Sequence, residues 1–168
     1  AGTSSAIASE GSLTIIGEDG GSLYAISSQL GMNSYDYKSY NAVIIAKGDV
    51  TIKNAKLTLW GKKGAEVPGD GASNKGYASC FGISADPGYN SSDPGDIIIE
   101  NSDITVTTGS VDGSGYGGNI HSACLAPKAN TILRGANTLS LTSQEYAVYS
   151  TGSGGIISVD LSRLSGAA

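Results

Sequence analysis

The sequence predicts an all-β fold, a right-handed, single-stranded parallel β-helix (a solenoid) of about five coils with loop insertions. The first observation is a repeated pattern in which apolar residues stand two apart, the period of a strand with one buried face. This pattern recurs in residues 13–17, 50–54, 97–101 and 131–135. The second observation is the presence of 25 glycines among 168 residues, which indicates many tight turns and little long helix. Repeated short strands separated by turns are typical of a solenoid.

A glycine or an asparagine closes each copy of the pattern at the same offset. The four residues are Gly17, Asn54, Asn101 and Gly135. Glycine and asparagine adopt positive φ more readily than other residues, so we expect each coil to turn a corner at this column. A β-sandwich is the structural alternative, but it does not require such a residue at one fixed offset.

Two further strands complete each predicted coil. Alternating segments follow the corner at residues 23–25, 57–59, 104–106 and 139–141, and related segments precede the pattern at residues 42–44, 79–81 and 123–125. Residues 147–149 and 157–161 form a fifth, shorter coil. Coils of this kind pair their backbones about 4.8 Å apart and align their apolar side chains. The predicted core columns are Ile15–Ile52–Ile99–Leu133 and Leu23–Leu57–Ile104–Leu139.

The chain is expected to form one β-helix domain over residues 1–168. Its coils span approximately residues 11–26, 41–60, 77–108, 120–142 and 146–161, and its insertions span residues 29–40, 61–76, 86–96 and 109–118. Because the insertions leave and enter neighbouring coils, we expect them to crowd one side of the stack. Loops on a rigid scaffold are where function usually resides.

Aromatic residues are concentrated in or beside these insertions. Rings exposed among Asn, Asp and Lys can stack on the apolar faces of sugars while the polar neighbours bond to hydroxyls. The alternative is that the rings pack the loops onto the coils. The candidate carbohydrate-binding residues are Tyr35, Tyr37, Tyr40, Trp60, Tyr77 and Tyr89.

Carboxylates in the third insertion suggest calcium. Asp86, Asp93 and Asp96 offer the hard oxygen ligands that Ca²⁺ prefers in flexible loops. Aspartate before glycine or proline is also ordinary turn chemistry, and no EF-hand spacing is present. We therefore expect that the protein requires no cofactor. Ca²⁺ is the ion that these three aspartates could bind.

The two cysteines fall at equivalent positions when residues 79–81 are aligned with residues 123–125. Cys80 and Cys124 would then stack at strand spacing, within reach of a disulfide. Val43 and Val148 occupy the same column in other coils, so the favoured interpretation is that both cysteines are small buried hydrophobes with free thiols.

The charge and composition exclude some classes of function. The net charge of −5 with only ten scattered Lys and Arg residues argues against nucleic-acid binding, which needs clustered positive charge. No apolar run approaches the roughly 18 residues of a membrane span. An acidic, cysteine-poor composition rich in Ser, Thr, Gly and Asn is common among exported bacterial proteins, so we expect a secreted or cell-surface location.

The sequence favours a non-catalytic protein. It contains no nucleophile elbow, phosphate-binding loop or HExxH motif, and nothing places a serine or carboxylate beside its one histidine, His121. A polysaccharide lyase would need calcium-bound uronate and a basic residue. Lys62, Lys63 and Arg134 are candidates for that base by residue type alone.

Three segments resemble the coils of pectate-lyase-like β-helices. They are residues 11–17 (GSLTIIG), 48–55 (GDVTIKNA) and 95–102 (GDIIIENS). More narrowly, they are similar to carbohydrate-binding β-helix modules on surface proteins of clostridia and other gut Gram-positive bacteria. The resemblance covers roughly residues 11–161. It implies binding of acidic plant polysaccharides or cellulose, and calcium in some coil turns.

We therefore expect a carbohydrate-binding or adhesion module of an exported bacterial surface protein, whose partner is a polysaccharide or cell-surface glycan. Two alternatives remain open at this point. One is a polysaccharide lyase or hydrolase, and the other is a structural spacer without a small ligand. Open solenoid ends also invite pairing, which suggests end-to-end self-association.

Overall fold

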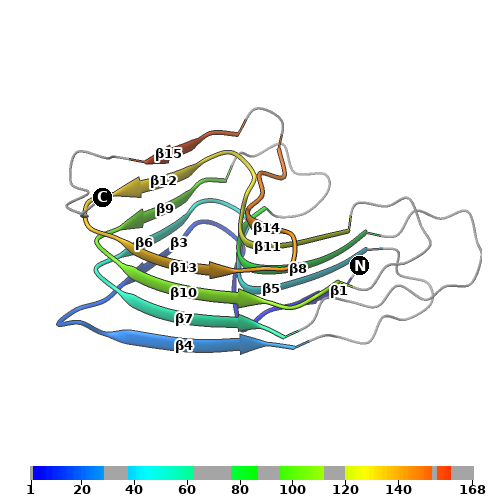
Figure 1. Ribbon diagram of the computed structural model, residues 1–168, viewed down its shortest axis with the longest axis horizontal. Coiled ribbons are helices and arrows are strands. Elements are labelled where there is room, and N and C mark those ends of the chain that lie inside the picture. The colour runs from blue at the N-terminus through cyan, green and yellow to red at the C-terminus, as the bar shows by residue number, and fades with distance from the viewer. Residues whose placement is uncertain are drawn as a thin grey trace, which may run out of the picture.

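The computed structural model describes residues 2–28, 38–62, 77–86, 95–111, 120–152 and 155–159. In this part of the chain, strands stack in three sheets that contain only parallel pairs, and the chain visits the three sheets in turn (Figure 1). This architecture confirms the predicted right-handed parallel β-helix. Among the described residues there is no helix with the length and apolar character needed to cross a membrane.

Each coil contributes one strand to each sheet. In the first coil the strand of sheet A is divided into two, and the described part of the last coil ends with its strand in sheet B. Sheet A consists of β1 (Gly2–Ser4), β2 (Ile7–Ser9), β5 (Lys38–Ala46), β8 (Tyr77–Ala85), β11 (Ile120–Pro127) and β14 (Tyr146–Val148). Sheet B consists of β3 (Leu13–Ile16), β6 (Val50–Lys53), β9 (Ile97–Glu100), β12 (Thr131–Arg134) and β15 (Ile157–Val159). Sheet C consists of β4 (Ser22–Ser27), β7 (Lys56–Gly61), β10 (Asp103–Thr108) and β13 (Thr138–Thr142).

The core is a stack of aligned aliphatic side chains, as the sequence predicted. In sheet B, Ile52 pairs with Ile15 on one side and with Ile99 on the other, and Ile99 pairs with Leu133. The predicted column of Leu23, Leu57, Ile104 and Leu139 is aligned in the same way in sheet C. Ile52 and Ile99 are completely buried. Burial of these columns is the main contribution of the side chains to the stability of the fold.

The corner between sheets B and C confirms three of the four predicted turn residues. Asn54, Asn101 and Gly135 have φ values of 50°, 48° and 72°. Gly17 lies at the same corner, where its N–H donates to the Lys53 carbonyl, but it is not among the residues with positive φ, so that part of the prediction is wrong.

The first coil turns this corner in a different way. The left-handed residues there are Asp19 and Gly20, with φ values of 51° and 77°, because residues 17–21 join β3 to β4 by a longer path. Gly17 is needed for a different reason. A Cβ atom at this position would lie 2.4 Å from the Asn54 carbonyl oxygen, so only glycine permits the close approach of the two coils.

The predicted alignment of the two cysteines is wrong by two residues. Cys80 pairs with Ser122, while Ala123 pairs with Phe81. Cys124 is therefore level with Gly82. A Cβ atom at Gly82 would lie 2.2 Å from Val106 Cγ1, so the core has room for glycine at this position and not for a larger residue. An offset of one strand and two residues separates two Cα atoms by about 8 Å, beyond the roughly 7 Å limit for a disulfide. Both thiols are free and buried, as the favoured interpretation expected.

We predict that shortening a core column destabilises the protein strongly. The substitution Ile99→Ala removes a fully buried side chain and should lower the free energy of unfolding by about 2–5 kcal/mol. Ile98→Ala, one residue away on the outer, partly exposed face, is the matched control and should cost clearly less. Urea unfolding of the two variants measures the difference, and equal losses would contradict the assigned facing of β9.

We also predict that stability falls in alkaline solution because of the two thiols. Desolvation by burial raises the pKa of Cys80 and of Cys124 from an ordinary value of 9.0 to about 11. The native state therefore retains its thiol protons where the unfolded chain has lost them. This contribution, on the order of 2 kcal/mol per thiol, is fully present below pH 9 and is lost as the pH rises to about 11.

The experiment is urea unfolding between these two pH values, with the double variant Cys80→Ala/Cys124→Ala as the control. The variant should lose less stability over the same interval than the natural chain does. An identical pH dependence of the two proteins would contradict the prediction.

Candidate functional site

The outer face of sheet C carries a regular array of exposed side chains, which we call the sheet C platform. Strand alternation turns every second residue of β4, β7, β10 and β13 outward, and all of these residues are exposed. Because the four strands are in register, the outward residues form three rows that cross the strands. Neighbours within a row are about 4.8 Å apart, and the rows are roughly 6.6 Å apart along the strands. The rows are Ser22–Lys56–Asp103–Thr138, Tyr24–Thr58–Thr105–Ser140 and Ile26–Trp60–Thr107–Thr142.

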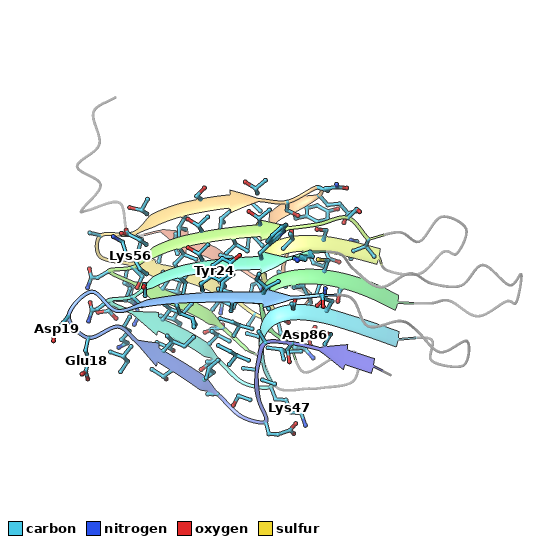
Figure 2. All side chains as sticks on the ribbon, turned by 90° about the horizontal axis from the view of Figure 1, so that it is seen from below. Glu18, Asp19, Tyr24, Lys47, Lys56 and Asp86 are labelled. Carbon is cyan, nitrogen blue, oxygen red and sulfur yellow. The ribbon has the colours of Figure 1, made fainter. Side chains whose placement is uncertain are left out.

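Large apolar side chains occupy the side of the platform formed by the first two coils, on β4 and β7. Tyr24 is 61% exposed, Trp60 41% and Ile26 37%. Trp60 pairs directly with Ile26 and is a diagonal neighbour of Tyr24, which pairs with Thr58. Figure 2 shows Tyr24 over the middle of the sheet, with Lys56 near one end of the strands. An exposed apolar patch rimmed by polar residues is the kind of surface that binds other molecules.

Hydroxyl groups cover the remainder of the platform. Apart from Asp103, every outward residue of β10 and β13 is a threonine or a serine. A hydroxyl both donates and accepts hydrogen bonds. The platform therefore combines stacking surfaces on β4 and β7 with a ladder of donors and acceptors on β10 and β13.

Charged groups lie where the strands of the platform begin and where they end. At one end Lys56 Nζ lies 3.8 Å from Asp103 Oδ2, with both side chains largely exposed. At the other end Lys62 Nζ lies 5.0 Å from the centroid of the Trp60 ring, in a cation–π arrangement. The rows that begin with Tyr24 and Ile26 contain no charged residue, so two of the three rows of the platform are neutral.

The structure separates the aromatic residues that the sequence singled out. Trp60 is on sheet C, whereas Tyr40 and Tyr77 belong to strands of sheet A, where Tyr40 pairs with Ser79 and Tyr77 with Lys38. The candidates Tyr35, Tyr37 and Tyr89 lie outside the described residues. Trp60 is thus the candidate that the structure places on the platform.

Sequence reasoning missed Tyr24 and Ile26. Tyr24 stands between Leu23 and Ala25, which continue the core pattern, and Ile26 follows them. The same alternation contained the missing signal, because residues between two inward-facing positions must face outward.

Two of the proposed calcium ligands have structural roles. One oxygen of Asp96, Oδ1, accepts hydrogen bonds from the backbone N–H and the side-chain amide of Asn130, each at 2.9 Å. The backbone N–H of Asp96 in turn donates to Asp49 Oδ1 at 2.9 Å, and that of Asp49 donates to Ser12 Oγ. Ser12, Asp49, Asp96 and Asn130 therefore form a ladder, one residue per coil, at the corner before sheet B.

Asp86 lies at a different position, 3.9 Å from Lys128 Nζ, where both side chains are mostly buried. Asp93 is outside the described residues. No group of three or more His, Cys, Asp or Glu side chains with the arrangement of a metal site occurs within the described ranges. Calcium binding by these three aspartates stays a prediction.

A second aromatic group lies on sheet A. The Tyr149 ring stacks on that of Tyr146 at 5.0 Å and lies 4.3 Å from the ring of His121. His121 Nδ1 is 3.6 Å from Glu145 Oε2, and Glu145 also accepts the backbone N–H of Ser122 at 2.8 Å. These contacts fasten the last coil to the preceding one, and burial raises the pKa of Tyr149.

Comparison of the chain with protein-family models, with curated proteins and with solved structures finds no match.

We predict that Asp96 stabilises the corner ladder through its acceptor oxygen. Asp96→Ala leaves two Asn130 donors without their partner and should lower the free energy of unfolding by about 1–3 kcal/mol. Asp96→Asn keeps one side-chain oxygen and should cost less. Urea unfolding with and without calcium checks both points. A stabilisation by calcium that Asp96→Asn abolishes would instead make this carboxylate a cation ligand.

Proposed function

We propose that the protein is a non-catalytic carbohydrate-binding or adhesion module, and that the sheet C platform is its glycan-contacting surface. The observation that carries the proposal is the exposure of Tyr24 and Trp60 on one face, in register with the hydroxyl rows of β10 and β13. The alternation of the strands already points these side chains outward, so the surface is preformed.

The first support is the chemistry of the patch. A sugar ring has apolar C–H faces and a polar edge, and aromatic rings bury the former while nearby polar groups bond to the latter. Tyr24 and Trp60 supply two rings on adjacent strands, and their Cα atoms lie diagonally about 8 Å apart. Thr58 and Thr107, which pair with them, place hydroxyls directly beside the rings.

The second support is the spacing of the rows. Successive strands place a hydroxyl every 4.8 Å or so along the solenoid axis, close to the rise per sugar of an extended β-linked glycan. A chain that lies across the strands can therefore repeat the same contacts from coil to coil.

An exported, cell-surface setting is part of the same proposal. It is supported by the low charge content and the abundance of Ser, Thr, Gly and Asn, and by the resemblance of the coil sequences to pectate-lyase-like modules of Gram-positive surface proteins. The two neutral rows of the platform favour a neutral glycan over a polyanion. Among the described residues of the platform and its rim, positive charge comes from Lys56 and Lys62, and Lys56 is paired with Asp103.

We predict that the two aromatic residues carry most of the binding. Each of the substitutions Tyr24→Ala and Trp60→Ala should cost about 1–2 kcal/mol of binding free energy, a roughly five- to thirtyfold loss of affinity. The measurement is affinity electrophoresis against a panel of polysaccharides, followed by calorimetry on those that retard the protein.

Tyr146→Ala is the matched control, because Tyr146 is 42% exposed, like Trp60, but lies on sheet A. It should leave the affinity unchanged. Retardation by no glycan, or an equal loss in the control variant, would refute the proposal. Appearance of unsaturated uronate products during incubation with a polyuronate would support the lyase alternative instead.

A further inference from the structure

Trp60 has a charged neighbour on the outer side of sheet C, Lys62, which follows it by two residues. The Nζ atom of Lys62 lies over the Trp60 ring, 5.0 Å from the ring centroid. Alternation along an extended chain places residues two apart on the same side of the sheet, so the lysine side chain and the indole ring stand on the same face. The geometry is that of a cation–π pair, in which the ammonium group is attracted to one face of the ring.

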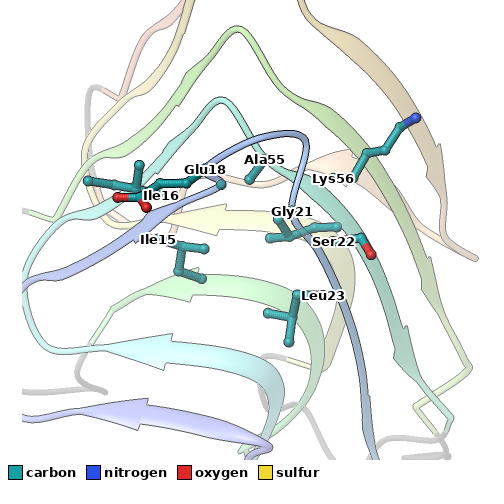
Figure 3. A pocket seen from close by; sticks show the side chains of 10 residues that line it. Ile15, Ile16, Glu18, Gly21, Ser22, Leu23, Ala55 and Lys56 are labelled. Carbon is teal, nitrogen blue, oxygen red and sulfur yellow. The ribbon is translucent and has the colours of Figure 1, made fainter.

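The charge of Lys62 is placed differently from that of Lys56, the lysine at the start of β7. Lys56 extends away from the interior of the coils (Figure 3), and its Nζ atom lies 3.8 Å from Asp103 Oδ2. Lys62 takes part in none of the ion pairs that the described residues form with one another. In this part of the chain, the group that its ammonium contacts is the Trp60 ring.

The backbone beneath this pair is fixed by both neighbouring coils. The Lys62 N–H donates to the Ser27 carbonyl of the first coil at 3.1 Å. On the other side, the Gly61 carbonyl accepts the Gly109 N–H of the third coil at 2.7 Å. The buried Cys80 thiol donates to the same carbonyl at 3.6 Å. The lysine side chain therefore starts from a fixed point, and the freedom that remains belongs to the two side chains.

The Trp60 ring is open to solvent on the platform. Its neighbours across the strands are Ile26 and Thr107, and Thr58 precedes it on the same face. These side chains are smaller than the ring and leave it 41% exposed. A sugar that stacks on a ring must restrict the rotation of that ring, and this ordering reduces the affinity. A contact that already restricts the ring in the free protein removes part of the cost.

We propose that Lys62 is a positioning residue of the glycan-contacting surface. Its ammonium group holds one face of the Trp60 ring and presents the other face to a sugar in a fixed orientation. The inference rests on the proposed function, because it assigns a role at the same site. A cation–π pair at an exposed position changes an equilibrium constant by about two- to fivefold, and this factor sets the size of the expected effect.

The first test needs no glycan. Trp60 is the one tryptophan of the chain, so tryptophan fluorescence reports on this ring alone. Lys62→Met removes the charge, keeps a long side chain and should increase the local motion of the ring, which lowers the fluorescence anisotropy. Lys62→Arg keeps a cation and should retain the natural anisotropy. An anisotropy of Lys62→Met equal to that of the natural chain would overturn the proposal.

The matched control for this test is Lys53→Met. Lys53 is a partly exposed lysine of the same coil, but it lies on sheet B, where its Nζ atom is 3.4 Å from Glu100 Oε2. Its replacement should leave the anisotropy of Trp60 unchanged. An equal decrease in Lys53→Met and Lys62→Met would mean that loss of any lysine loosens the coil, and the specific role of Lys62 would be wrong.

The second test measures retardation by glucomannan, a neutral β-linked polysaccharide, in affinity electrophoresis. Lys62→Met should weaken the affinity about two- to fivefold, whereas Lys62→Arg should retain it. A higher affinity of Lys62→Met would show that the ammonium group and the sugar compete for one face of the ring. In the background of Trp60→Ala, Lys62→Met should cause no further loss, because no ring remains to be positioned. A further loss there would make Lys62 a direct glycan contact, and either result would overturn the proposal.

Failure of this inference can be told apart from failure of the proposed function. Retardation that depends on Trp60 but is unchanged in Lys62→Met rejects the positioning role alone. An anisotropy that depends on Lys62, together with no retardation of the natural chain by glucomannan or any other polysaccharide of the panel, rejects the glycan-binding function and leaves the contact between Lys62 and the ring in place.

Discussion

Every feature of this structure depends on backbone hydrogen bonding between coils that keep the same register. A β-helix has no single strand pair that could stabilise it alone. Its coils become stable because each one satisfies the polar edge of the coil before it. In the described part of the chain, each sheet stacks its strands in parallel order without a reversal. Any local insertion must therefore return the chain to the same register at the next strand.

The corners show how the sequence maintains this register where regular strand pairing ends. At the corner before sheet B, Ser12, Asp49 and Asp96 each accept a backbone N–H from the following coil, so polar side chains continue the hydrogen bonding that the strands begin. At the corner before sheet C the direction is reversed, since Ser102 Oγ accepts the N–H of Ala55 from the preceding coil. Because an unpaired buried N–H is costly, these residue types are determined by the fold and offer little information about a ligand.

This distinction explains which parts of the molecule could be predicted from sequence. The core columns were predicted correctly because an alternating apolar pattern and a corner residue report directly on strand facing. The cysteine alignment failed because the pattern in β8 contains Gly82, which lacks the side chain needed to show which positions face inward. The role of Asp96 at its corner could not be predicted, because an aspartate that accepts hydrogen bonds in a turn and one that binds a cation have the same sequence surroundings. The hydrogen bonds from Asn130 to Asp96 depend on the three-dimensional stack of the coils.

The location of the candidate site follows from the same logic. In sheet C the inward residues must be aliphatic to fill the core, and the fold places no comparable demand on the outward residues. Stability alone would favour small polar residues there, as on β10 and β13. Tyr24, Ile26 and Trp60 instead expose large apolar surface to water, which costs solubility and adds nothing to the core. The widened corner of the first coil lies at the same end of the solenoid and leaves Ile15 and Leu23 only partly covered. Both departures from the regular coil occur on the first two coils, and the exposed aromatic residues among them are the ones on which the proposed glycan surface is built.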